Sequence, residues 1–187
     1  MYQIVCVLVL EISVSVILPM LHGKMNRRAR SKIIAMLLII YICGNLYCTV
    51  FSRQPGFESK VDLRPFKAYS ELVASVEIKD TVVNKSLFTT FMSGTEPIHV
   101  LILNILLYYP LGYLLPILFP KLKPKHVILI GWLCSIATEA TQYLLKMGWC
   151  ETDDVIHNTL GTAIGVWVWH LQSKRLSKPK STELPKD

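Results

Sequence analysis

The sequence lacks the residue patterns that mark the most familiar catalytic and metal-binding sites. It has no HExxH motif, no glycine-rich phosphate loop and no Ser–His–Asp spacing, so a zinc peptidase, a P-loop protein and a triad hydrolase are not indicated. Four of its five cysteines lie inside apolar runs, which is neither a disulfide framework nor a zinc pattern. We therefore predict no metal and no cofactor.

Polar residues are too few for an ordinary soluble domain. Hydrophobic residues make up 52% of the 187-residue chain, and the mean hydropathy is +0.42. Apolar runs recur that are long enough to cross roughly 30 Å of hydrocarbon. The first run lacks a basic segment before it and an obvious cleavage site, so it does not read as a removable signal peptide. We predict an all-α, polytopic membrane bundle integral to the bilayer.

Five predicted spans form a single domain over residues 1–171. The spans cover residues 2–21, 33–51, 98–119, 127–147 and 154–171. Residues 172–187 are polar and basic, which predicts a disordered cytoplasmic tail. Within the long outer loop, residues 67–78 show the spacing of a short amphipathic helix that lies on the bilayer surface or covers the bundle.

Basic residues are concentrated in three of the connecting segments. Of the 20 Lys and Arg, five precede the second span, three separate the third and fourth, and five lie in the tail. The loop of residues 52–97 is balanced in charge, and the hairpin of residues 148–153 has acids only. Because cytoplasmic loops are enriched in Lys and Arg, we predict the N-terminus outside and the C-terminus inside. The net charge of +7 therefore indicates membrane orientation rather than a nucleic-acid partner.

Two predicted spans carry polar side chains that a bilayer should exclude. Glu139 and Gln142 lie three residues apart, so they share one helical face. Asp154 and Asn158 share a face of the next span. An ionisable group at the bilayer centre costs about 2.5–3.5 kcal/mol or more, so it marks a functional site by default. Glu11 in the first span is either a paired, structural carboxyl or a further member of that site.

These polar residues are predicted to lie at similar depth in the outer half of the bilayer. At about 1.5 Å per residue, Asn104 lies about 9 Å below the outer end of its span. Gln142 and Glu139 lie roughly 8 and 12 Å deep, and Asn158 lies about 6 Å below Asp154 at the outer mouth. Their coincidence predicts one outward-facing polar pocket, although a network that merely holds the helices together is the alternative.

The pocket has side chains suited to acid–base chemistry and to phosphate binding. An apolar wall shifts the titration of Glu139 toward neutral pH, which suits a general acid or base, and Asp154 near water stays ionised as its partner. Arg64, on the outer loop, would hold a phosphate bidentately. Substrate hydrogen bonds come from the amides of Asn104, Gln142 and Asn158. His157 lies three residues after Asp154, so a site for a divalent metal at these side chains is an alternative.

Three glycines are predicted to pack helices closely. Gly161 and Gly165 have small-xxx-small spacing, which lets two helix backbones approach. Gly112 shares a face of the third span with Asn104 and Tyr108.

Four blocks carry a family resemblance: residues 62–66 (DLRPF), residues 104–116 with Pro110 and Pro116, the Glu139 and Gln142 pair, and residues 154–165, beginning DVIHNTLG. Their order and spacing resemble the VanZ-like membrane protein family. Asp62 stands where that family usually has Asn, and its common Arg before the acidic pair is missing here. The resemblance implies a bacterial cell membrane setting linked to resistance to the lipoglycopeptide teicoplanin.

Three functions remain open from the sequence. The first is an outward-facing site for a membrane lipid or lipid-linked envelope precursor, with Glu139 and Asp154 as catalytic residues. The second is a non-catalytic protein that binds such a lipid or shields the bilayer from an antibiotic. The third is a lipid flippase or small transporter, although the five spans show no internal repeat of the kind often found in transporters.

Overall fold

The computed structural model describes residues 26–52, 56, 61–67, 69 and 97–177. Its elements are α2 (Arg27–Leu46), a π-helix η1 (Tyr47–Phe51), β1 (Val61–Asp62), α5 (Pro97–Leu118), α6 (Pro124–Leu144), β2 (Cys150–Glu151) and α7 (Thr152–Ser177). The predicted span at residues 2–21 lies outside the described residues. So does the predicted amphipathic helix at residues 67–78, apart from Lys67 and Tyr69.

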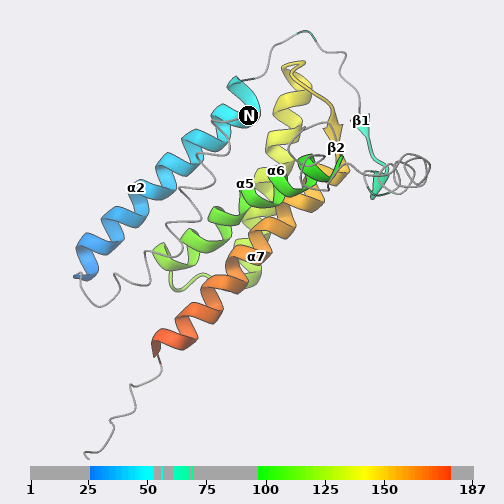
Figure 1. Cartoon of the computed structure of the whole chain (residues 1–187). Coiled ribbons are helices and arrows are strands. Elements are labelled where there is room, and N and C mark those ends of the chain that lie inside the picture. Colours follow the sequence, from blue (N-terminus) through cyan, green and yellow to red (C-terminus); the bar gives the residue numbers. More distant parts are fainter. Residues whose placement is uncertain (1–25, 53–55, 57–60, 68, 70–96, 178–187) are drawn as a thin grey trace, which may run out of the picture.

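The described chain is mainly helical, as predicted. Three helical segments in it are long and apolar enough to cross a membrane, namely Arg27–Phe51, Val100–Leu118 and Pro124–Leu144. The fourth, α7, has 26 residues, but its first turn carries Asp153 and Asp154. It lies against α5 and α6 rather than apart from them (Figure 1).

Several helix ends differ from the sequence prediction for local reasons. α2 begins at Arg27 rather than residue 33, because the Asn26 side chain caps it by accepting a hydrogen bond from the Ala29 N–H at 2.8 Å. α6 begins at Pro124, a residue suited to the first helical position. α7 continues to Ser177, so the start of the predicted disordered tail is helical. Its last turn holds basic side chains that favour the negative end of the helix dipole.

Successive helices alternate in direction. Asn104 and Tyr113 of α5 contact residues near the start and end of α7, so these two helices run parallel. Gln142, near the end of α6, donates to the Thr49 carbonyl at the end of the α2–η1 segment. The starts of α5 and α7 therefore meet the ends of α2–η1 and α6. We call this the polar end of the bundle.

Glycines let α5 and α7 touch through their backbones. A Cβ added at Gly112 would collide with the carbonyl oxygen of Thr162, and one added at Gly161 with that of Ile105. At Gly165 the obstacle is the carbonyl oxygen of Tyr109. All three glycines singled out in the sequence thus lie in this contact, where backbones approach closely.

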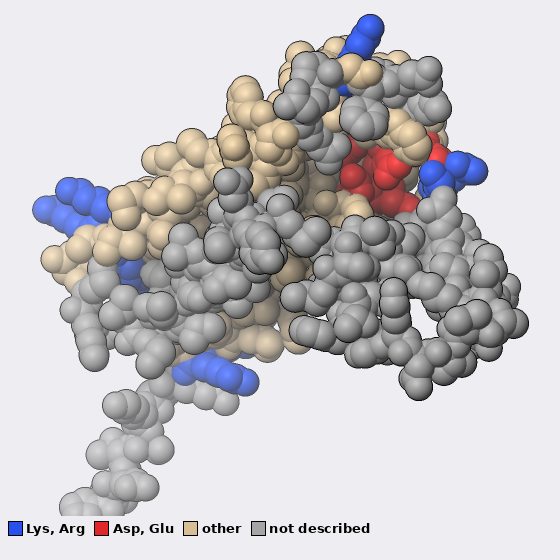
Figure 2. Space-filling model, turned by 45° about the horizontal axis from the view of Figure 1, so that its top comes forward, with Lys and Arg blue, Asp and Glu red and all other residues tan. Residues whose placement is uncertain are grey.

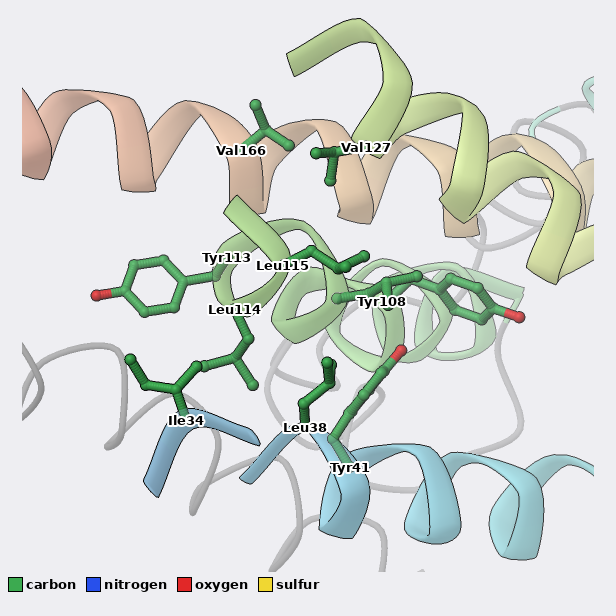
Figure 3. Close-up of a cluster of buried hydrophobic side chains, with 10 residues drawn as sticks. Ile34, Leu38, Tyr41, Tyr108, Tyr113, Leu114, Leu115, Val127 and Val166 are labelled. Carbon is green, nitrogen blue, oxygen red and sulfur yellow. The ribbon is translucent and has the colours of Figure 1, made fainter. Parts of the chain in front are cut away.

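The apolar core lies between α2 and α5. Ile34, Leu38 and Tyr41 of α2 pack against a buried set from α5 (Figure 3). That set is Tyr108, Leu111, Tyr113, Leu114 and Leu115. α6 and α7 add Val127 and Val166 to it. This core holds the helices whose ends carry the polar groups.

Candidate functional site at the polar end

A short parallel β-ladder anchors the outer loop to the hairpin between α6 and α7. Val61 pairs with Cys150 and Asp62 with Glu151. Sequence reasoning missed this pairing, since two-residue strands have no readable alternation. It brings the loop that carries Arg64 to residues that follow α6 and lie 89 positions later in the chain than their partners in β1.

A buried aspartate fixes the turn that follows Arg64. Asp153, 7% exposed, accepts a hydrogen bond from the Phe66 N–H at 2.5 Å. Phe66 has φ 64°, a left-handed conformation that a non-glycine residue adopts at a cost. Tyr69 adds a second tie, because its hydroxyl lies 3.0 Å from His157 Nε2 on α7. Asp153 is thus a residue that the sequence analysis did not assign, although it sits beside Asp154 in an acidic helix start.

The two predicted catalytic carboxylates lie at the polar end and bridge different elements. Asp154 Oδ1 accepts a hydrogen bond from Asn104 Nδ2 at 2.6 Å, which joins α7 to α5. Glu139 Oε2 accepts the backbone N–H of Glu151 at 3.0 Å, which joins α6 to β2. Glu139 is only 3% exposed. Glu139 therefore ties the hairpin to α6, and Asp154 ties the start of α7 to α5.

Two predicted substrate-binding amides are buried inside the bundle. Gln142 Nε2 donates to the Thr49 carbonyl at 2.9 Å, and Asn158 Nδ2 donates to Ser135 Oγ at 2.8 Å. Their side chains are 2% and 4% exposed. Among the described residues, no donor reaches Gln142 Oε1 or Asn158 Oδ1. Gln142 lies three residues after Glu139 on α6, and Asn158 lies across the contact between α6 and α7. Buried acceptors without a hydrogen-bond donor are rare in native proteins.

Arg64 lies on the surface and forms a bidentate ion pair with Asp62. Its Nη2 and Nε lie 2.6 and 2.9 Å from the two Asp62 oxygens, and Lys67 Nζ lies 3.0 Å from the same carboxylate. Lys67 also lies over the Trp149 ring, 5.6 Å from its centre. Figure 2 shows acidic atoms gathered on one part of the surface with basic side chains beside them.

These side chains line an open cleft of about 870 Å³. We call it the outer cleft, and its lining residues are Val61, Asp62, Leu63, Arg64, Pro65, Lys67 and Trp149. Among the residues that line the cleft, two cations share one carboxylate. The Arg64 side chain is 73% exposed, which leaves it reachable from outside.

Hydrogen bonds from Arg64 and Lys67 hold the pKa of the Asp62 carboxyl well below its usual range. A depressed pKa means that the ion pair stabilises the loop above the ordinary carboxyl pKa of about 4 and is lost only as the pH falls below it. The outer cleft therefore keeps its arrangement across neutral and mildly acidic pH.

Cys150 offers a chemical readout of the nearby carboxylates. Burial, reinforced by the negative charges of Glu139 and Asp154, raises the pKa of its thiol. With Cys150 as the sole cysteine, we expect slow alkylation by iodoacetamide at pH 8 and faster alkylation in Glu139→Gln, because removing a negative charge lowers that pKa. Stopped-flow or mass-spectrometric rates measure this.

The matched control for that measurement is Lys125→Gln, a charge change at the opposite end of the bundle, which should leave the rate unaltered. An identical rate in Glu139→Gln and the parent protein would mean that Glu139 carries no charge near Cys150.

The described part of the chain contains no group of three or more His, Cys, Asp or Glu side chains placed to hold a metal ion. His157, for which the sequence left a metal role open, has its Nε2 beside Tyr69. Its observed neighbours therefore give it a role in holding the loop.

Comparison with known proteins gives one family and one weak relative. The VanZ/LLP1 family model matches residues 9–173. A protein from Enterococcus faecium named Protein VanZ is 28% identical over 98 residues. That alignment covers 51% of this chain and 60% of the relative, so the chain spans less than two thirds of the relative's length. No solved structure matches the chain.

Proposed function

Since this chain belongs to the VanZ/LLP1 family, we propose that it is a multi-pass protein of the bacterial cell membrane that binds the phosphate-bearing headgroup of a lipid. The polar end faces the cell exterior, with the N-terminus outside and the C-terminus inside. The proposal includes a link to glycopeptide or lipoglycopeptide resistance, which the likeness to Protein VanZ suggests.

The outer cleft is the observation that carries this proposal. Arg64 and Lys67 converge on Asp62 beside Trp149, at the end of helices that are apolar enough to span a bilayer. Guanidinium and ammonium groups bind phosphate oxygens, the guanidinium in two-point geometry. Tryptophan is favoured at the membrane–water interface, where headgroup phosphates lie. The charge, the aromatic ring and the position all fit a lipid phosphate.

Replacing Arg64 with alanine should weaken binding of phosphatidylglycerol about tenfold, because a hydrogen bond to a charged group contributes about 1.5 kcal/mol or more. Binding is measured by native mass spectrometry of the purified protein in a neutral detergent. Diacylglycerol, which lacks the phosphate, is the ligand control.

Lys146→Ala is the matched protein control, since it removes an exposed cation near the polar end that does not line the outer cleft. It should bind phosphatidylglycerol as the parent does. Equal losses in the two variants, or equal binding of diacylglycerol by the parent, would refute a phosphate site at Arg64.

Catalysis by Glu139 and Asp154 is the second candidate function. A buried carboxyl beside the hairpin, with a second carboxylate that contacts Asn104, is an arrangement from which general acid–base chemistry can start. Glu139→Gln keeps the shape and the hydrogen-bond acceptor for Glu151 but removes the proton chemistry. A lipid product that accumulates in membranes with the parent and disappears with Glu139→Gln would establish catalysis. Unchanged antibiotic tolerance in a folded Glu139→Gln protein would exclude it.

A further inference from the structure

A second, apolar cleft lies between α2, α5 and α6, and the proposed headgroup site does not account for it. Its volume is about 370 Å³. Aliphatic side chains from all three helices line it, among them Leu38, Leu111, Leu115 and Ile130. Figure 3 shows Leu38 and Tyr41 reaching from α2 toward α5. We call it the inner cleft.

The polar side chains in the wall of the inner cleft hydrogen-bond to each other or to the backbone of α6. Asn45 Nδ2 donates to the Tyr41 hydroxyl at 3.1 Å, and the Tyr108 hydroxyl lies 3.0 Å from Thr138 Oγ1. Thr141 Oγ1 donates to the Ala137 carbonyl at 2.7 Å. The wall therefore presents methyl, methylene and ring surface. An apolar cavity of about 150 Å³ already stays dry and binds a molecule as large as benzene, so a cleft of 370 Å³ suits a longer hydrocarbon.

The inner cleft lies next to the polar end along α6. Thr138 and Thr141 line it, while their chain neighbours Glu139 and Gln142 turn to the buried polar network. The helices around it are the three in the described part of the chain that are long and apolar enough to cross a bilayer, so its natural surroundings are lipid chains. The outer cleft at the same end carries the charge opposite to that of a phosphate.

We propose that the inner cleft holds a hydrocarbon chain of the same lipid whose phosphate binds at Arg64 and Lys67. The identity of that lipid rests on the proposed function. That hydrocarbon chain enters the protein between α2 and α6 instead of lying in the surrounding bilayer. The protein thus recognises a lipid at two points, one charged and one apolar.

The test uses the full-length protein in bilayer nanodiscs with phosphatidylglycerol that carries a diazirine in the middle of one acyl chain. After irradiation, crosslinks are mapped by mass spectrometry. Leu111 and Leu115 are 6% and 8% exposed, so lipid that merely surrounds the protein does not reach them. We expect crosslinks at these two residues, reduced at least fivefold in Ala137→Trp, where the ring fills the cleft.

Ala140→Trp is the matched control, because Ala140 is an exposed alanine on the same helix that does not line the cleft. It should keep the crosslinks. Their absence at Leu111 and Leu115, or their persistence in Ala137→Trp, would overturn the inference. If Arg64-dependent binding of phosphatidylglycerol is meanwhile retained, only the inner cleft fails.

A diacylglycerol with the same diazirine separates this inference from the proposed function. Preference for phosphatidylglycerol, lost in Arg64→Ala, supports a lipid shared by both clefts. Equal crosslinking by both probes, unaffected by Arg64→Ala, supports a hydrocarbon site in the inner cleft and refutes its sharing a lipid with Arg64.

Discussion

Replacing Gly161 with alanine should destabilise the protein by about 1–3 kcal/mol, as overpacking of a tight contact does. Helix propensity alone predicts the opposite sign, because alanine stabilises a helix interior by up to about 1 kcal/mol relative to glycine. The difference lies in the α5–α7 contact, where a Cβ at Gly161 meets the Ile105 carbonyl. Backbone atoms cannot rotate away as a side chain can, so the helices must separate. Equilibrium unfolding in mixed detergent micelles measures the change.

Leu160→Ala is the neighbouring control, since Leu160 is 44% exposed and its loss should alter stability by less than about 0.5 kcal/mol. Gly112→Ala should repeat the Gly161 result, because its Cβ would meet the Thr162 carbonyl from the other side of the contact. A Gly161→Ala protein that is more stable than the parent would show that α5 and α7 are not packed backbone to backbone.

Replacing Asp153 with alanine should weaken phosphatidylglycerol binding more than Arg64→Ala does. Asp153 accepts the Phe66 N–H, and this bond fixes the loop that carries both Arg64 and Lys67. A hydrogen bond to a charged group contributes about 1.5–3 kcal/mol, which corresponds to roughly 10- to 150-fold in affinity if the loop is released. The same native mass-spectrometric titration measures it, together with the unfolding free energy.

Asp153→Asn retains a carbonyl oxygen for the Phe66 N–H, so it should lose less affinity than Asp153→Ala. This graded loss identifies a positioning role. If both variants unfold more readily yet bind phosphatidylglycerol as the parent does, Asp153 serves the fold alone and not the outer cleft.

Apolar run length predicted the described helices well but not their ends. Long hydrophobic stretches placed α2, α5 and α6 correctly, since crossing hydrocarbon sets a minimum length. The ends depend on single capping residues, such as Asn26 and Pro124, which an apolar window overlooks. Arg27, Arg28, Arg30 and Lys32 look like a loop by charge, yet they form the first turns of α2.

Helical spacing brought Asn104, Glu139 and Asp154 to one end of the bundle, because depth follows from position along a span. It could not predict their partners. Glu139 binds the backbone of β2, and Arg64 binds Asp62 two residues away, contacts that depend on how the loop folds. Asp153 escaped notice because its partner is a backbone N–H, which carries no sequence signal.

The location of the polar end relative to the cell is tested most directly by cysteine labelling in intact bacteria. In a protein without its native cysteines, Leu145→Cys places a thiol on the exposed turn after α6, and Lys123→Cys places one between α5 and α6. A membrane-impermeant maleimide should label the first in intact cells and the second only after the membrane is permeabilised. Labelling of Lys123→Cys but not Leu145→Cys in intact cells would put the carboxylates and Arg64 in the cytoplasm and contradict an outward-facing headgroup site.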